Sequence, residues 1–178
     1  MEIKTKRLIL RELKSSDAKS LQENLNNLNV SKWLEAISYP YSLKDAKSFI
    51  SMCKKEARKK PRVKYEFAVV LKEGKINIGS MGLYLKTKHR KASLGYWIGE
   101  KYWRKGYGSE ALKSIINFAF KKLKLIRLEA EIYPRNPSSG KLLEKHGFVK
   151  EGLMRKSSIC KADGKIKDSI AYGLVRHY

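Results

Sequence analysis

The sequence predicts a single domain over residues 1–178 of the α/β (α+β) class, with a mixed central sheet flanked by helices. The length of 178 residues suits one domain, and an apolar content of 42% is enough to form a core. The first half of the chain holds alternating patterns joined by short turns, which are typical of antiparallel hairpins. The second half alternates strand patterns with helix patterns, which is typical of strand–helix–strand units.

The N-terminal third predicts one strand followed by helices. Residues 3–13 alternate apolar and polar side chains, the period-two pattern of a strand with one buried face. Ser15, Ser16 and Asp17 follow, and their side chains can cap the N-terminus of a helix. Three helices with apolar residues at helical spacing are then predicted: 18–28, 30–37 and 42–60.

The rest of the chain predicts six strands and two helices. Strands at 63–71 and 76–85 are joined around Gly74, which indicates a hairpin. The helix that begins near Ser109 carries a broad apolar stripe suited to packing on a sheet. The remaining elements are strands at 92–98, 127–132, 148–157 and 166–175 and a helix at 138–146.

A basic loop punctuated by glycines connects the strand at 92–98 to the following helix. Glycines allow backbone N–H groups to approach an anion, and the N-terminus of a helix adds partial positive charge, so such a loop is a phosphate cradle in physical terms. Arg104 and Lys105 place full positive charges beside it. The loop reads Trp103-Arg104-Lys105-Gly106-Tyr107-Gly108-Ser109.

A second motif follows the glycine loop in the sequence. Asn136-Pro137-Ser138-Ser139 precedes a short helical pattern that ends in Glu144-Lys145-His146-Gly147-Phe148. Together with the glycine loop, this motif resembles the GNAT superfamily of acetyl-CoA-dependent N-acetyltransferases. The likeness covers nearly the whole chain and is greatest to the branch that acetylates the N-terminal amines of ribosomal proteins. It includes the opening segment Thr5–Leu13, Arg127–Ala130 and the strands from Glu151 onward.

The resemblance implies a mostly antiparallel sheet that splays at the cofactor site, and acetyl-CoA as co-substrate. The pyrophosphate loop of the superfamily reads Gln/Arg-x-x-Gly-x-Gly/Ala. Gly106 and Gly108 match this pattern, but Trp103 occupies its first position, which matters little if backbone amides bind the phosphates. The residues that the resemblance assigns to acetyl-CoA are Trp97, Ile98, Arg104, Lys105, Gly106, Tyr107, Gly108, Ser109 and Asn136.

The resemblance also suggests catalytic residues. Many members have a tyrosine proton donor seven residues after the asparagine, but that position is Leu143 here, and the ribosomal branch points to Ser139 instead. Glu131 matches the glutamate that serves as base, through water, in a related branch acting on α-amines. Asn136 is assigned to the cofactor and to ordered water near the amine.

Structural interpretations compete with each of these roles. Asn136 can simply cap a helix, and a serine such as Ser139 is common near a helix start. Glu129 and Glu131 project from the same face of one strand and can pair with lysines on its neighbours. His146, near a helix C-terminus, is expected to be structural. The side chain of Trp97 is expected to pack in the core.

The charge of the chain is extreme. Forty Lys and Arg residues against 17 Asp and Glu give a net charge of +23, with basic clusters at 54–64 and 86–91. One interpretation is contact with ribosomal RNA, and the other is a lysine-rich composition with solvated faces. Under either interpretation, the net positive charge would repel polyamine acceptors unless an acidic pocket outweighs it.

Composition also limits the environment of the protein. No stretch approaches the roughly 20 apolar residues that span a bilayer, and no signal peptide is visible after Met1. Cys53 and Cys160 have neither metal-ligand spacing nor a catalytic partner motif, so we expect reduced thiols, no metal site and a cytoplasmic protein.

The leading functional hypothesis is acetyl transfer from acetyl-CoA to the N-terminal α-amine of a protein, with a ribosomal protein as the expected acceptor. The alternative acceptor is a small amine such as an antibiotic or an amino acid. A third hypothesis is a ribosome- or nucleic-acid-binding module on an inactive acetyltransferase fold. The basic clusters lack interleaved aromatic residues, which argues against that module. The sequence leaves monomer and dimer open.

Overall fold

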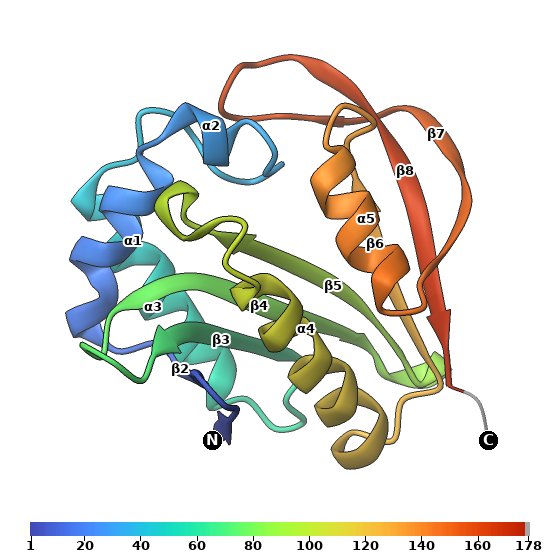
Figure 1. Cartoon of the computed structure of the whole chain (residues 1–178), viewed down its shortest axis with the longest axis horizontal. Helices are drawn as coiled ribbons and strands as arrows, with labels where there is room; N and C mark the ends of the chain where they lie inside the picture. Colours follow the sequence, from blue (N-terminus) through green and yellow to red (C-terminus); the bar gives the residue numbers. More distant parts are fainter. Residues whose placement is uncertain (177–178) are drawn as a thin grey trace.

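A computed structural model describes residues 1–176 and contains an eight-stranded sheet with helices on both faces (Figure 1). The strand order is β1-β2-β3-β4-β5-β6-β8-β7, and every neighbouring pair is antiparallel except β5 and β6. This mixed, mostly antiparallel sheet confirms the predicted fold class. The strands are β1 (Glu2–Lys4), β2 (Leu8–Glu12), β3 (Lys64–Leu71), β4 (Asn77–Lys86), β5 (Lys91–Ile98), β6 (Arg127–Ile132), β7 (Val149–Ile159) and β8 (Ile166–Val175).

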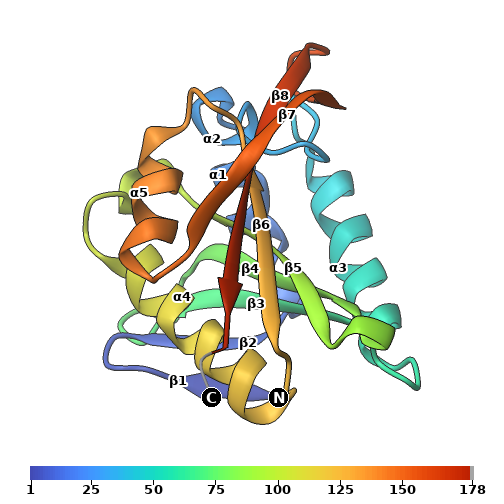
Figure 2. The same ribbon diagram turned by 90° about the vertical axis from the view of Figure 1, so that its right-hand side faces the viewer.

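The helices divide between the two faces of the sheet, as Figure 2 shows. Helices α1 and α3 cover one face, while α4 and α5 cover the other. A π-helical turn at Phe118–Lys122 extends α4. The α-helices are α1 (Ala18–Leu25), α2 (Leu28–Ser31), α3 (Leu43–Ala57), α4 (Tyr107–Asn117) and α5 (Pro137–Lys145).

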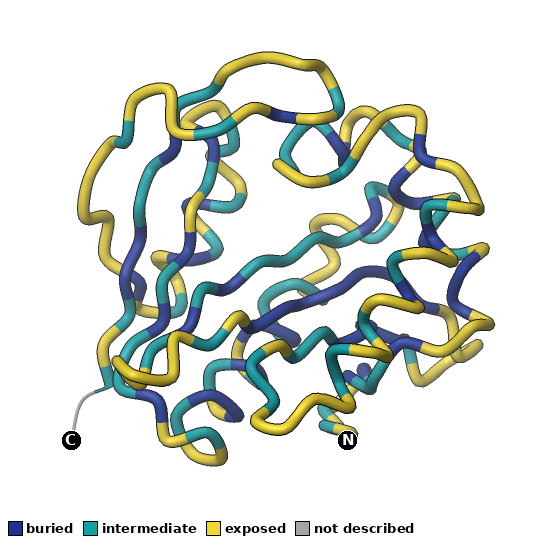
Figure 3. Tube along the Cα trace, turned by 180° about the vertical axis from the view of Figure 1, so that it is seen from behind, coloured by how far each residue is buried: buried dark blue, intermediate teal, exposed yellow. Residues whose placement is uncertain are grey.

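Each face of the sheet has its own core. Phe67, Met81 and Leu128 are fully buried beneath α4 and α5. Ala68 and Val70 point the other way and pack with α1 and α3, because successive side chains of a strand face opposite sides. The buried strands β3 and β4 therefore lie at the centre of the molecule (Figure 3).

The sheet splays between β5 and β6. These parallel strands pair only from Lys91 opposite Arg127 to Ser93 opposite Glu129. Beyond that point β5 continues to Ile98 and β6 to Ile132 without pairing to one another, and the gap between them opens toward their carboxyl ends (Figure 1). The predicted splay is confirmed, and it exposes strand-edge backbone groups beside the glycine loop.

Two predicted elements differ most from the structure. The predicted helix 18–28 also ends early, at Leu25, and Leu28 begins α2. The predicted strand 3–13 is two strands, β1 and β2, because the chain turns back after Thr5, whose backbone and side chain both bond Leu8. The predicted helix 30–37 is reduced to α2, because the β7–β8 hairpin competes for the carbonyl groups that follow. Lys167 Nζ donates to Lys32 O at 2.9 Å, and Lys161 N donates to Glu35 O at 3.0 Å.

Within residues 1–176, no helix has the length and apolar character needed to cross a membrane.

Candidate active site

The glycine loop forms a cradle of free amides at the start of α4. Gly106 caps this helix with φ +78°, a left-handed conformation that favours glycine. The first bond of the helix runs from Glu110 N to Gly106 O, at 3.1 Å. The N–H groups of Tyr107, Gly108 and Ser109 precede that bond and have no partner within the helix, so they are available to an anion.

Arg7, in the N-terminal segment, holds this loop and was not among the site residues that the sequence predicts. Arg7 Nη1 donates to Lys105 O at 2.9 Å, and Arg7 Nε donates to Glu110 Oε2 at 2.7 Å. Burial raises the pKa of Glu110, but hydrogen bonds from Thr5 and Arg7 outweigh it and lower the pKa. The Arg7 guanidinium also lies 4.5 Å from the centre of the Tyr107 ring. Arg7 thus balances the negative charge of Glu110, the one acidic residue in the first turn of α4, where the phosphates would bind.

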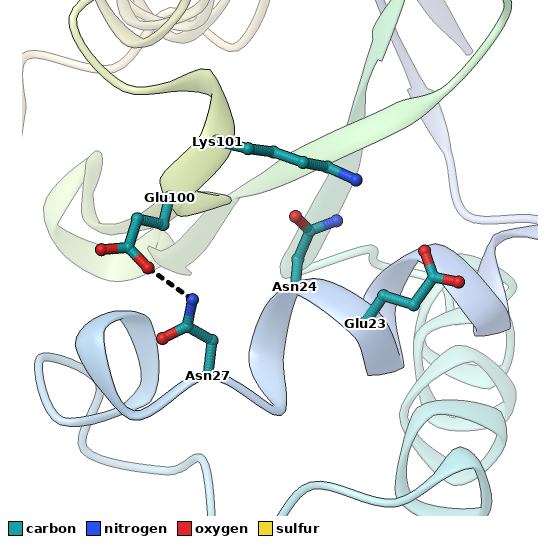
Figure 4. Close-up of a pocket in the computed structure, with 5 residues that line it drawn as sticks. All are labelled: Glu23, Asn24, Asn27, Glu100 and Lys101. Carbon is teal, nitrogen blue, oxygen red and sulfur yellow. Dashed lines mark hydrogen bonds between the residues drawn. The ribbon is translucent and has the colours of Figure 1, made fainter.

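The junction between α1 and α2 is bonded to the segment after β5 (Figure 4). Asn27 Nδ2 donates to Glu100 Oε2 at 2.6 Å, and Asn29 Nδ2 donates to Glu100 Oε1 at 2.9 Å. A Cβ at Gly99 would lie 2.0 Å from Asn24 Oδ1, so only glycine permits this close approach. The contact leaves a surface pocket of about 250 Å³ that is locally acidic in a strongly basic protein. Its lining residues are Glu23, Asn24, Asn27, Glu100 and Lys101.

Trp97 and Ile98, which the resemblance assigns to acetyl-CoA, have different environments. The side chain of Trp97 packs against the core beneath α1 and α3, whereas Ile98 faces α4 and α5. The indole N–H of Trp103 donates to Ile98 O at 2.6 Å, which closes the turn that leads into the glycine loop. Trp103 therefore has a structural use at the position where the superfamily pattern has Gln or Arg.

Asn136 begins α5 and presents Ser139. The Asn136 side chain accepts a bond from Ser139 N at 3.3 Å, and Pro137 occupies the first helical position, so the local sequence is that of a capped helix start. Ser139 Oγ lies 2.6 Å from the hydroxyl of Tyr96, on the side of β5 that faces α5. Leu143, at the position of the usual tyrosine, is fully buried in the core.

Helices α4 and α5 meet beside the cradle. Ser109 Oγ lies 2.8 Å from His146 Nε2, and burial lowers the pKa of His146, so a neutral ring is favoured. The Ser109 hydroxyl is thus directed at α5, and its backbone N–H remains for the cradle. A Cβ at Gly108 would lie 3.5 Å from Leu142, so this position lies at the contact between the two helices.

Glu129 and Glu131 share a face of β6 but differ in their partners. Glu129 accepts bonds from Lys91 at 2.8 Å, Arg127 at 3.0 Å and Lys86 at 3.4 Å. Burial raises the pKa of Glu129, but these bonds outweigh it and lower the pKa to about 2. Glu131 is exposed and forms no ion pair with any residue of the described chain. The structural interpretation therefore holds for Glu129 and not for Glu131.

The site fits coenzyme A on structural grounds. The free amides of 107–109 and the neighbouring positive charges suit its phosphates, and the unpaired edges of β5 and β6 suit an extended amide-bearing arm. Among the described residues there is no group of three His, Cys, Asp or Glu side chains that could hold a metal ion. The fold and the cradle together define an acyl-CoA-dependent transferase.

Comparison with known proteins shows which family of transferases this is. The family model of the acetyltransferase (GNAT) domain matches residues 7–149. The uncharacterized N-acetyltransferase p20 of Bacillus licheniformis is 31% identical over 97% of this chain and 94% of its own. The chain therefore belongs to the GNAT family of acetyltransferases, and it is an N-acetyltransferase that uses acetyl-CoA.

Two further relatives are connected with ribosomal proteins. A Vibrio cholerae structure provisionally described as a ribosomal-protein-serine acetyltransferase superposes with a TM-score of 0.83, at 29% identity over 99% of this chain and 98% of its own. The Escherichia coli [ribosomal protein uS5]-alanine N-acetyltransferase is 30% identical over 56% of this chain and 50% of its own.

Proposed function

We propose that this enzyme acetylates the N-terminal α-amine of a protein, with a ribosomal protein as acceptor, by direct transfer within a ternary complex. The observation that carries the proposal is the carboxylate of Glu131, which makes no ion pair within residues 1–176 and lies beside the splay, on the face of β6 opposite Ala130. Ala130 packs toward α5, the helix that carries Ser139. This arrangement supports a proton acceptor on one face of the sheet and a hydrogen-bond donor on the other, both beside the gap.

Each residue then has a defined task in amine acetylation. Acetyl-CoA supplies an acetyl group activated as a thioester. The amides of 107–109, with Arg104 and Lys105, bind its phosphates, and backbone groups at Trp97 and Ile98 orient the acetyl carbonyl. Glu131 removes a proton from the amine through water, which needs only modest help because an α-amine has a pKa near 8. Ser139 donates a hydrogen bond to the departing sulfur, and Asn136 orders water near the amine.

The distribution of charge supports a large polyanionic partner. Leu85 N donates to Val63 O at 2.8 Å, and the Arg90 guanidinium donates to Lys124 O at 2.9 Å, so three lysine-rich segments meet at one end of the sheet. We call residues 54–64, 86–91 and 121–124 the basic end. β5 and β6 both run from the basic end toward the splay, which places it about 20–25 Å from the site, by the rise of a strand. Ribosomal RNA bound at this end would leave the splay free for a protein N-terminus, and such a partner is consistent with a cytoplasmic enzyme.

A labelling experiment tests the acceptor. Purified enzyme and isotopically labelled acetyl-CoA are incubated with ribosomal proteins and with a panel of free amines and antibiotics, and mass spectrometry locates the label. Label on protein N-termini, absent with Gly106→Glu, is the expected result. Label confined to small amines would replace the proposal with the small-molecule alternative, and label on internal lysines would also contradict it.

A further inference from the structure

The hydroxyl of Ser139 is not isolated. Tyr96 Oη lies 2.6 Å from Ser139 Oγ and 3.4 Å from Ser139 O, so the phenol bridges from β5 to the first turn of α5. This bridge spans the side of the splay where β5 has no pairing with β6. The sequence separation of 43 between Tyr96 and Ser139 explains why the contact could not be read from either motif.

The direction of this hydrogen bond decides what Ser139 can do. A serine hydroxyl has a single hydrogen, so it cannot donate both to Tyr96 and to a second group. If the phenol is the donor, the hydrogen of Ser139 is free to point into the splay. The alternative acceptor for the phenol, Ser139 O, is more distant by the distances above, which favours the bond to Oγ.

The surroundings of Tyr96 keep its proton in place. Burial raises the pKa of Tyr96 to about 12, and the bond with Ser139 offsets this only in part. Tyr172 on β8 is the other titratable group that acts on Tyr96, and its hydroxyl donates to Glu144 Oε1 at 3.0 Å. The phenol of Tyr96 therefore remains a donor at any pH at which the enzyme would be assayed.

We infer that Tyr96 is a positioning residue for the leaving group: its phenol donates to Ser139 Oγ and thereby presents the Ser139 hydrogen to the departing sulfur. The inference rests on the role proposed for Ser139. As the amine nitrogen bonds to the acetyl carbon and the carbon–sulfur bond breaks, the sulfur leaves as a thiolate that accepts a hydrogen bond from Ser139 Oγ, while Tyr96 keeps its proton. The thiolate then takes a proton from water. The proton lost by the amine leaves through Glu131.

Steady-state kinetics of single and double variants test this coupling. Tyr96→Phe should lower kcat by about 5–10-fold and change KM for acetyl-CoA by less than about 2-fold. The lost hydrogen bond acts in the chemical step and not in the binding of acetyl-CoA. Tyr96→Phe in a Ser139→Ala background should cost almost nothing more, since the phenol acts through that hydroxyl. Tyr172→Phe is the matched control, because it removes another phenol that contacts α5, and it should retain wild-type kcat. Full additivity of the two losses would overturn the inference.

A binding experiment tests the same inference without any acceptor. Calorimetry compares coenzyme A with desulfo-coenzyme A, which lacks the thiol, between pH 7 and 10. For the wild type, the affinity for coenzyme A relative to that for desulfo-coenzyme A should rise with pH by roughly 3–10-fold. The reason is that the hydrogen bond from Ser139 stabilises the thiolate form of coenzyme A. Tyr96→Phe should flatten this rise and leave desulfo-coenzyme A affinity unchanged. An equal rise in both proteins would contradict the role of Tyr96 even if labelling had assigned another acceptor.

Discussion

The two glutamates of β6 show how neighbours divide roles between identical side chains. They stand two residues apart on one face of the strand. Glu129 forms ion pairs with three cationic side chains, whereas Glu131 forms none within residues 1–176. A carboxylate with a pKa near 2 is a weak proton acceptor at neutral pH. Glu129 is therefore not a substitute base, and the proposed general base is Glu131 alone.

Replacement of Glu131 tests that division of roles. Glu131→Gln keeps the shape of the side chain and removes its charge, so the acidic limb of the pH profile of kcat/KM should disappear or move to higher pH. Glu129→Gln is the matched control. It should lower stability through the loss of its ion pairs and leave the pH profile in place. An unchanged profile for a folded Glu131→Gln enzyme would assign the proton to bulk water.

At the scale of elements, the start of α4 depends on residues that are far apart in the sequence. The amides of 107–109 require the left-handed conformation at Gly106, and Arg7 of the segment between β1 and β2 lies against the same glycine. A Cβ at Gly106 would be 3.3 Å from Arg7 Nη2. The cradle is thus a contact between elements and not a property of the loop alone.

Gly106→Glu should abolish binding of acetyl-CoA, because bulk, strain at positive φ and negative charge all enter the cradle. Arg7→Ala tests the support separately, and we expect acetyl-CoA affinity to fall by roughly 10-fold as the loop loses an ion pair and a hydrogen bond. Calorimetry measures both, with circular dichroism to establish folding. Wild-type affinity in a folded Gly106→Glu variant would show that the phosphates bind elsewhere.

Periodicity predicts the elements whose pattern is local. The predicted bounds of β6 and β8 agree with the structure. In β6 the apolar residues alternate over the whole strand. The segment after α2 is different, since its backbone bonds go to a hairpin more than 120 residues away. The same holds in the site: the amides of 107–109 lie within one motif, whereas the Tyr96–Ser139 and Arg7–Glu110 contacts arise only when the sheet forms.

At the scale of the whole molecule, the net charge of +23 is concentrated away from the chemistry. The basic end lies at the amino-terminal ends of β5 and β6, and the splay lies at their carboxyl ends. Several of its side chains are exposed and make no ion pair within residues 1–176. These include Lys55, Arg58, Lys60 and Lys88.

Reversal of those four charges should therefore weaken ribosome binding without harming catalysis. If binding is governed by phosphate contacts, affinity falls steeply with salt, and the loss of about four contacts should reduce the slope of log affinity against log salt by about 3 to 4. Turnover of a short peptide should stay within about 2-fold of wild type, because the splay is untouched.

A second quadruple variant controls for net charge. Reversal of Lys44, Lys47, Lys72 and Lys75 changes the total charge equally but alters exposed lysines that lie outside the basic end. Affinity for ribosomes and for random duplex RNA is measured for wild type and both variants across a salt series. A specific docking surface predicts that only the first variant loses the preference for ribosomes. Equal losses in both variants, or equal affinity of the wild type for the two RNAs, would mean that the charge acts only as a diffuse field, and the ribosomal acceptor would then depend on the labelling experiment alone.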